Sequence, residues 1–378
     1  MPTIKDINSI GLEHDLGESN AYGMARGLTS VRSATIIILE TDTGISGLGE
    51  TWGPPTMVKA ALEILKPYFI GRDLADHALI TPYFYAQRYH LGIQNSFTSC
   101  LGGIDIAAFD AIGKLHGVPV CQLLGGTSQD RIPAYASDGY FSVNPKNKLK
   151  DQLLSFLDRG FLGVKIKIGR GPNDDANRVA FAREALGSDI YLMVDGNGNY
   201  TSDIAQKSMQ RIKDYDIHFY EEPLSPTDFD GYARLRSKSD ISLAAGEALY
   251  TTNDFKRLSD VGGCDIWQPD LTLCGGFTVG KEIAALARTS HVQISPHVWG
   301  GAVGLAAALH FASAQTPWPH TDNIPHHALF EHDQGDNILR DKLLKTPIPC
   351  VDGHLIVPMG PGLGIELNWE IVYKYRVV

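Results

Sequence analysis

The 378-residue chain is too long for one small core and has room for two domains, one of which could be a barrel of about 200 to 250 residues. Its composition, 43% hydrophobic and 20% charged, is typical of a soluble globular enzyme. The net charge of −10, without a run of lysines or arginines, argues against nucleic acid or an anionic membrane as a partner, but a local cationic site for an acidic substrate stays possible.

The location expected from the sequence is the cytoplasm. The first ten residues, MPTIKDINSI, contain no apolar segment of the kind that opens a secretory signal, and no window is long and apolar enough to span a bilayer. The cysteines are odd in number, widely spread and never arranged as CxxC, so neither a disulfide framework nor a zinc site is indicated. They are Cys100, Cys121, Cys264, Cys274 and Cys350.

The first part of the chain, residues 1–127, has the pattern of an α+β domain. ATIIILETDTGISGLGE (34–50) predicts two strands joined at Asp42-Thr43-Gly44, with GLGE (47–50) as a strand end rather than a phosphate loop. Apolar residues at helical spacing follow in TMVKAALEILKPYFI (56–70) and GIDIAAFDAIGKLHGV (103–118). Strands followed by helices favour a separate domain.

From residue 128 to 344 short apolar runs alternate with helical segments. The runs are RIPAYAS, GVKIKIG, DIYLMVDGNG, IHFYEEP, ISLAAGEAL, CDIWQPDL, VQISPHVW and HALFEHD. Eight such repeats predict parallel βαβ units closed into a barrel. A doubly wound open sheet is the alternative, but no GxGxxG opens the first helix. The remaining residues, 345–378, return to short strands punctuated by Gly and Pro, and we expect them to pack back on the first domain.

An ionisable residue stands at or near the end of every run from the second to the eighth. These residues are 23 to 34 positions apart, which is about one βα repeat: Lys167, Asp195, Glu221, Glu247, Asp270, His297 and Glu331. In a βα barrel the catalytic groups come from the carboxyl ends of the strands, so these side chains should converge on one mouth.

Asp195, Glu221 and Glu247 would lie on three consecutive strands, about 5 Å apart from strand to strand. Three ionised carboxylates so close would repel each other unless a cation lay among them. Oxygen-only ligation with room for water favours one Mg²⁺ per site over Zn²⁺. Each acid taken alone could simply cap the next helix, but three in consecutive repeats favour a metal site.

Candidate bases lie on both sides of these carboxylates. His297, in ISPHVWG, would be oriented and held basic by Asp270 on the neighbouring strand. Lys165 and Lys167 share one face of a strand, and their mutual repulsion is expected to lower the pKa of both, leaving one neutral near pH 7. The other histidines, including His326 and His327, are expected at the surface or at the rim. A cation with bases on two sides suits removal of a proton next to a carboxylate.

The chain resembles the mandelate racemase subgroup of the enolase superfamily over essentially its whole length. The matching segments are GIDIAAFDAIGKLHGVPVCQLLGG, KIKIG, VDGNG, YEEP, AAGEAL, QPDLTLCGGF, PHVWGG and GPGLGIE. The resemblance implies a modified TIM (β/α)7β-type barrel with an N-terminal α+β capping domain that the C-terminal tail completes. It makes Asp195, Glu221 and Glu247 the Mg²⁺ ligands, Lys167 one base, and the Asp270–His297 dyad the other.

Further roles rest on the resemblance alone. It implies that Lys165 holds the substrate carboxylate and tunes Lys167, and that Glu331 hydrogen-bonds the enediolate. Glu222 is expected behind the ligands and Asn197 near the metal. The capping loops are expected to select the substrate: in the segment 13–30, with glycines typical of a mobile lid, Arg26 could meet a distal carboxylate, and in TWGPP (51–55) Trp52 could wall the pocket.

Members of this subgroup racemise, dehydrate or open lactones from the same intermediate, so the fold leaves the reaction open. The segments QPDLTLCGGF and PHVWGG look closest to acid-sugar dehydratases and aldarolactone cycloisomerases, which favours β-elimination from a sugar acid or its lactone. Racemisation or epimerisation is the second reading, and a non-catalytic binding protein on the same scaffold the third. WGGAVG (299–304) partly matches a phosphate nest, but its glycines are interpreted as allowing close approach to His297. We expect a homo-oligomer.

Overall fold

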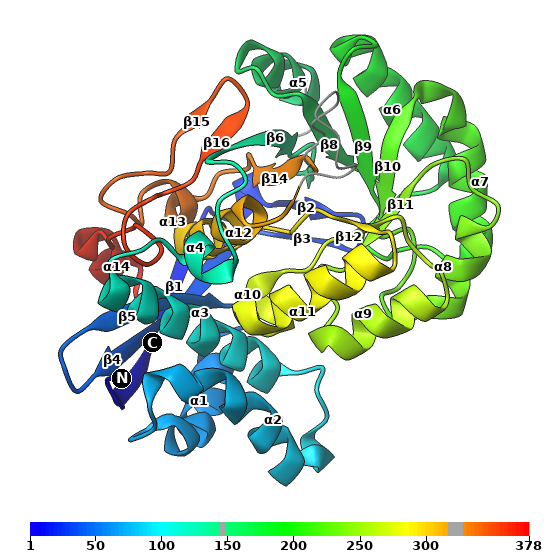
Figure 1. Ribbon diagram of the computed structural model, residues 1–378. Helices are drawn as coiled ribbons and strands as arrows, with labels where there is room; N and C mark the ends of the chain where they lie inside the picture. The colour runs from blue at the N-terminus through cyan, green and yellow to red at the C-terminus, as the bar shows by residue number, and fades with distance from the viewer. Residues whose placement is uncertain (144–147, 317–327, 378) are drawn as a thin grey trace.

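The computed structural model describes residues 1–143, 148–316 and 328–377. A barrel surrounded by helices forms one body, and a smaller domain of strands and helices packs against it (Figure 1). The predicted barrel with an α+β capping domain is confirmed by this architecture. His326 and His327, expected at the surface or at the rim, lie outside the described residues. The same prediction is wrong for His77, His310 and His332, which are buried.

The barrel strands follow one another in chain order and run parallel. Their hydrogen-bonded order is β14-β6-β8-β9-β10-β11-β12-β13. They are β6 (Arg131–Ser137), β8 (Gly163–Lys167), β9 (Tyr191–Asp195), β10 (Ile217–Glu221), β11 (Leu243–Ala245), β12 (Ile266–Trp267), β13 (Gln293–Ile294) and β14 (Phe330–Asp333). Between the two end strands, Ser295 Oγ donates to the Leu329 carbonyl at 2.7 Å, which links β13 to β14.

The connecting helices cover the outer face of the strands, as Figure 1 shows. They are α5 (Lys148–Asp158), α6 (Pro172–Leu186), α7 (Ser202–Ile212), α8 (Phe229–Arg236), α9 (Thr251–Asp260), α10 (Leu271–Cys274), α11 (Gly276–Thr289) and α12 (Ala302–Ser313). Alternate residues of each strand point outward to these helices: Val164 and Ile166 of β8 belong to the core that the helices complete. Met193 and Phe219 point inward and form part of a small inner cluster.

That alternation decides where the functional side chains point. Lys165 and Lys167 of β8 are two apart, Asp195 is two after the inward Met193, and Glu221 is two after the inward Phe219. All four therefore face the barrel axis at its carboxyl end. The register brings them level, because Lys167 pairs with Asp195 and Asp195 pairs with Glu221 across neighbouring strands.

The capping domain is a three-stranded antiparallel sheet covered by helices. The predicted hairpin is β4 (Val31–Thr41) with β5 (Ser46–Thr51), and β1 (Ile4–Asp15) pairs along the other edge of β4. The helices are α1 (Pro55–Phe69), α2 (His77–Gln87), α3 (Ser96–His116) and α4 (Val120–Leu124). Asn95 begins α3 by accepting a hydrogen bond from Phe97 N, and Gly117 ends it in a left-handed conformation.

The segment 13–30, predicted to be a lid, contains a small hairpin of β2 (Tyr22–Met24) and β3 (Gly27–Thr29). This hairpin pairs with β7 (Phe141–Ser142), which follows the first barrel strand, so it lies at the carboxyl end of the barrel. No helix in the described part of the chain is both long and apolar enough to cross a bilayer.

The C-terminal residues contact both domains. They form α13 (Ile338–Asp341), β15 (Cys350–Val351), β16 (His354–Ile356) and α14 (Trp369–Tyr375). The strand β16 pairs with β6 of the barrel, whereas Val377 N donates to the Gly11 carbonyl of the capping sheet at 2.9 Å.

Candidate active site at the carboxyl end of the barrel

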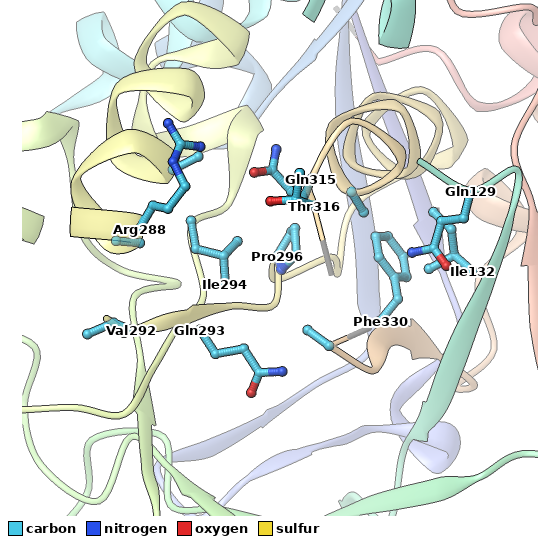
Figure 2. Close-up of a pocket in the computed structure, with 14 residues that line it drawn as sticks. Gln129, Ile132, Arg288, Val292, Gln293, Ile294, Pro296, Gln315, Thr316 and Phe330 are labelled. Carbon is cyan, nitrogen blue, oxygen red and sulfur yellow. The ribbon is translucent and has the colours of Figure 1, made fainter. Parts of the chain in front are cut away.

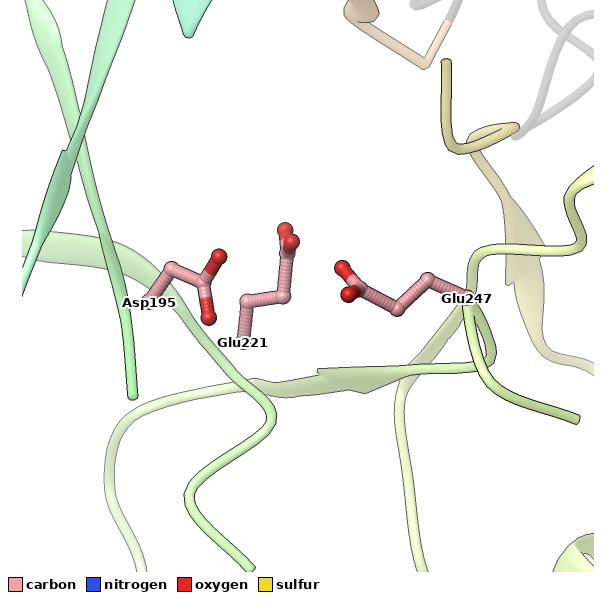
Figure 3. Close-up of side chains that lie close together, drawn as sticks. All are labelled: Asp195, Glu221 and Glu247. Carbon is pink, nitrogen blue, oxygen red and sulfur yellow. The ribbon is translucent and has the colours of Figure 1, made fainter. Parts of the chain in front are cut away.

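Three carboxylates converge at the ends of consecutive barrel strands. Asp195 ends β9, Glu221 ends β10 and Glu247 follows β11, and one oxygen from each lies within 4.8 Å of the other two. In Figure 3 their carboxyl groups point into the same space. Asp195 and Glu221 are fully buried, and Glu247 is partly exposed on the open side. A compact set of oxygen donors with one open side fits a hard divalent cation that keeps water or substrate ligands.

Burial makes this cluster costly without a cation. It raises the pKa of Glu221 to about 8, although Lys165 opposes the shift and the neighbouring acids add to it. Asp195, by contrast, has a pKa below its ordinary value, because the lysines outweigh the effect of burial. Burial thus has the larger effect on Glu221 and the lysines have the larger effect on Asp195, so the pKa values of the two crowded acids move apart.

The two lysines are held by the carboxylates. Lys165 Nζ lies 2.5 Å from Glu221 Oε1 and 2.7 Å from Glu331 Oε1, and Lys167 Nζ lies 2.5 Å from Asp195 Oδ2. The prediction that both lysines have a lowered pKa is wrong. Burial and Lys165 do lower the pKa of Lys167, but Asp195 outweighs them and the net shift is upward. The pKa of Lys165 is likewise raised, since burial is outweighed by Glu221 and Glu331.

A histidine–aspartate dyad lies on the other side of the carboxylates. His297 Nδ1 donates to Asp270 Oδ2 at 2.8 Å, which leaves Nε2 facing the cluster, 3.5 Å from Glu247 Oε2. Burial disfavours the charged imidazole, but Glu247, Glu331 and Asp270 outweigh it and raise the pKa of His297 to about 10. Asp270 is itself fixed by hydrogen bonds from Thr272 N (2.8 Å) and Thr272 Oγ1 (2.6 Å).

Glu331 connects the lysine side to the histidine side. In addition to its ion pair with Lys165, it accepts a hydrogen bond from Val298 N at 3.0 Å through Oε2. That oxygen lies 3.8 Å from His297 Nε2. Burial would favour the neutral acid, yet Lys165 and His297 lower the pKa of Glu331 to about 2. Glu331 is therefore a fixed negative charge between the two sides.

Two residues beside the ligands have strained backbones. Asn197 and Glu222 have φ angles of 43° and 37°, in the left-handed region that favours glycine. Asn197 N donates to Asp195 Oδ1 at 2.7 Å and so orients that carboxylate. Within the described residues, the buried Asn197 Oδ1 and Glu222 Oε1 have no hydrogen-bond partner. Free oxygens at this position are consistent with the expected proximity of Asn197 to a cation.

The two residues proposed to select the substrate lie at the rim. Arg26, in the turn between β2 and β3, is exposed and donates to the Gly198 carbonyl at 2.5 Å, three residues after Asp195. Trp52 is 38% exposed and packs on Trp299 with ring centroids 5.7 Å apart. Both indoles line a cavity of about 330 Å³ between the capping domain and the loop after His297.

Two polar residues next to the site were not predicted from the sequence. Gln268 Nε2 donates to Glu221 Oε2 at 2.5 Å and holds that ligand from the barrel interior. Tyr140 follows the first barrel strand, its ring 5.5 Å from Lys167 Nζ, and its hydroxyl donates to Asp333. A signal existed for Tyr140: it comes just after RIPAYAS, at the strand end for which no residue was assigned.

Another cavity, of about 70 Å³, lies at the outer side of β13 (Figure 2). It is lined by residues of the helix layer and strand edges such as Arg288, Ile294 and Phe330, and shares none with the carboxylate cluster. Two of its lining residues, Thr316 and Ala328, border the part of the chain that is not described, so this cavity has no assigned role.

Both domains match models of known protein families. Residues 148–371 match the model described as "Enolase C-terminal domain-like", and residues 14–125 match "Mandelate racemase / muconate lactonizing enzyme, N-terminal domain". The chain is 36% identical over 349 residues to the D-galactarolactone cycloisomerase of Agrobacterium fabrum, covering 92% of each chain. It is 31% identical over 344 residues to the arabinonate dehydratase of Saccharolobus solfataricus, covering 89% of each.

Solved structures also superpose closely on this chain. The 3,6-anhydro-D-galactonate cycloisomerase from Zobellia galactanivorans superposes with a TM-score of 0.89 at 31% identity, with full coverage of both chains. A racemase from Streptomyces coelicolor with bound magnesium superposes with a TM-score of 0.86 at 25% identity, covering 99% of this chain and 100% of that one.

Proposed function

Because the chain belongs to the mandelate racemase/muconate lactonizing enzyme family of the enolase superfamily, we propose that it removes the proton next to the carboxylate of a sugar acid or its lactone and completes a β-elimination. One observation carries this proposal: Lys167 and the His297–Asp270 dyad lie on opposite flanks of the three carboxylates. In strand order, the ligands on β9, β10 and after β11 separate the base on β8 from the base after β13.

The oxygen donors of Asp195, Glu221 and Glu247 fit one Mg²⁺, which when bound supplies the positive charge that stabilises a doubly negative enediolate. Lys165 is placed to hold the substrate carboxylate from the side of Glu331. Lys167 and His297 Nε2 are placed to move protons on opposite faces of the α-carbon. In an anti elimination one of them takes the α-proton and the other protonates the leaving oxygen.

The same pair of groups supports a racemase or epimerase, which needs proton transfer on both faces. Relatives named for cycloisomerase and dehydratase reactions favour elimination over this second candidate. A non-catalytic binding protein is disfavoured because the seven strand-end positions retain ionisable residues, all drawn into contact with one another or with the cluster. A cytoplasmic location, a homo-oligomer and the domain limits 1–127, 128–344 and 345–378 stay predictions.

The test is α-proton exchange. The protein is incubated with Mg²⁺ in D₂O with a panel of mono- and diacid sugars and their lactones, and loss of the α-proton signal is followed by NMR. We expect exchange in at least one stereochemical series and none after the metal is chelated. A 2-keto-3-deoxy acid would identify elimination, and an inverted but otherwise unchanged acid would identify racemisation. Folded, Mg²⁺-binding protein that exchanges no acid contradicts the proposal.

Replacing each base separates the two faces. With a pair of sugar acids epimeric at C2, Lys167→Ala should abolish exchange of one epimer and His297→Ala that of the other. Loss of about 100-fold or more is expected on the affected face, since a positioned acid or base contributes 10²- to 10⁴-fold. Equal losses on both faces in each variant would contradict separate roles.

A further inference from the structure

A carboxylate of the capping domain is bound at the start of α12, next to the loop that carries His297. Glu50, the last residue of GLGE and the penultimate residue of β5, is 2% exposed. Oε1 accepts a hydrogen bond from Gly301 N at 2.5 Å and Oε2 one from Gly304 N at 2.8 Å. Both amides belong to the start of α12, the helix that follows the loop bearing His297. Helix N-termini present such unpaired N–H groups and favour a negative charge.

The loop is shaped to receive this carboxylate. A Cβ atom at Gly300, Gly301 or Gly304 would collide with or crowd the carboxyl group of Glu50. These glycines were expected to allow a close approach to His297; the group that approaches is Glu50. Burial raises the pKa of Glu50 to about 7, although the Gly301 and Gly304 N–H groups favour its charged form.

The same strand end also touches the aspartate of the dyad. Trp52 N donates to the Thr272 carbonyl at 3.0 Å, and Thr272 fixes Asp270 through its amide and hydroxyl groups. Asp270 in turn accepts the hydrogen bond from His297 Nδ1. Residues 50–52 therefore contact the loop after His297 and the turn after Asp270, and both members of the dyad are supported from the capping domain.

Among the described residues, no hydrogen bond or ion pair joins Lys167 to the capping domain. Its carbonyl accepts from Arg178 Nε at 2.6 Å, its amide donates to the Gly139 carbonyl at 3.3 Å, and its ammonium pairs with Asp195. All three partners belong to the barrel. The two candidate bases are thus positioned by different parts of the molecule.

We propose that Glu50 is a positioning residue for His297, anchoring its loop so that Nε2 faces the substrate, and that it has no part in placing Lys167. The inference rests on the proposed proton-transfer function and deepens it. Glu50 is not a catalytic residue, because both of its oxygens bind backbone amides in a buried position. Its loss should therefore reduce turnover on one face of the substrate and leave the KM unchanged.

The variant Glu50→Gln is the direct probe, because its NH₂ group would face a backbone N–H donor. The matched control is Asp110→Asn. Asp110 is also buried in the capping domain and also accepts two backbone hydrogen bonds, from Leu48 N and Leu363 N, each at 2.7 Å. It has no contact with the dyad, so its loss should lower stability without selecting a face.

Exchange is measured for both C2 epimers at about pH 8, above the pKa of Glu50. Glu50→Gln should lower the rate on the His297 face on the order of 10- to 100-fold, the usual cost of losing a group that orients a functional side chain. The Lys167 face should change by less than about twofold in the same variant. In the Lys167→Ala background the loss should persist, and in the His297→Ala background it should disappear.

Equal losses on both faces, or no loss, would overturn the inference, provided that the wild-type protein exchanges both epimers. Absence of exchange in the wild-type protein points instead to failure of the proposed function. In that case amide hydrogen exchange of the peptide spanning 297–304 decides: anchoring by Glu50 predicts faster exchange there in Glu50→Gln than in Asp110→Asn, and equal rates refute it. If Glu50→Gln does not fold, Glu50→Asp, which keeps the charge but is shorter, should give a smaller loss confined to the same face.

Discussion

The buried side chains of the barrel illustrate how neighbours set the charge of a residue. Lys165 and Lys167 are buried, and the carboxylates that pair with them raise the pKa of each. Glu221 and Glu331 pair with Lys165, and Asp195 of the adjacent strand pairs with Lys167. Two of these carboxylates, Asp195 and Glu221, are also proposed to hold the cation. The lysine charges balance the charges of the acids that face them.

His310 is a buried histidine that the structure holds neutral. On α12, its Nδ1 accepts from Cys121 N at 3.3 Å and its Nε2 donates to the Leu363 carbonyl at 3.1 Å, so neither nitrogen is free to take a proton. Burial lowers the pKa of His310 from its ordinary 6.5 to about 4. The unfolded chain binds a proton below pH 6.5 while the folded protein does not, so stability falls as the pH drops from 6.5 towards 4.

We predict that His310 lowers the free energy of unfolding by about 2 kcal/mol when the pH is reduced from 6.5 to about 5. In urea titrations at the two pH values, His310→Gln should flatten the pH dependence by this amount. The exposed His116, replaced by Gln on the neighbouring α3, serves as the control and should leave the slope unchanged. A wild-type slope in His310→Gln would mean that His310 is protonated in the folded protein.

At the scale of elements, the capping sheet packs on α3 through glycines. Gly47 and Gly49 lie on one face of β5, where a Cβ atom would collide with the carbonyl oxygens of Ala107 and Gly103 of α3. Strand and helix backbones therefore meet directly, and this close crossing supports the strand end that carries Glu50. The GLGE motif thus has a packing reason for its glycines and a separate reason for its acid.

Gly49→Ala should reduce the free energy of unfolding by about 1–3 kcal/mol or more, because the helix must move to admit a methyl group. Gly27→Ala, in the exposed hairpin turn where a Cβ would meet nothing within 4 Å, should change it by no more than about 0.5 kcal/mol. Both values come from denaturant unfolding. Equal stability of the two variants would show that β5 and α3 separate without cost.

The elements that could be predicted from the sequence have strong local signals. The eight barrel strands are apolar runs at a regular repeat, and the hairpin of β4 and β5 has a turn signal at Asp42-Thr43-Gly44. The long strand β1 was missed, since polar residues interrupt its alternation, and β2, β3 and β7 are only two or three residues each. Their pairing is set by tertiary contact, which no local pattern reveals.

The same distinction holds for the site. Residues at strand ends were found because barrel geometry places them together, and Asp195, Glu221, Glu247, Asp270 and His297 do lie together. Glu50 and Gln268 were missed, since their importance lies in contacts with residues 251 and 47 positions away in the chain. The lysine pKa shifts were predicted in the wrong direction because the lysine pair was considered without the acids facing it.

For the whole molecule, the two domains are joined by a buried ion cluster in addition to the Glu50 contact. Arg32 of β4 is 1% exposed, pairs with Asp333 at 3.0 Å, and lies between the rings of Tyr22 and Trp299. Asp333, at the end of β14, also pairs with Arg340 at 3.1 Å. One carboxylate thus pairs with two guanidinium groups, one from each side of the domain boundary.

Asp333→Asn should therefore destabilise the protein by about 3–5 kcal/mol, since it leaves the buried Arg32 without its counter-charge. The control is Asp341→Asn, which removes another partner of Arg340 at a half-exposed position and should cost less than about 1 kcal/mol. Thermal or urea unfolding monitored by circular dichroism measures both. Similar small losses would indicate that water reaches the Arg32 cluster.

The glycine-lined space that receives Glu50 has a consequence for exchanging domains between relatives. A chimera that joins this barrel to another capping domain keeps Gly300, Gly301 and Gly304, which leave a gap and two amides that only an inserted carboxylate fills. A donor domain with a glutamate at the matching strand end would restore the loop, whereas one without it would leave an unfilled void beside His297. Compatibility of grafted domains can thus be screened at a single position before any loop is redesigned for a new sugar.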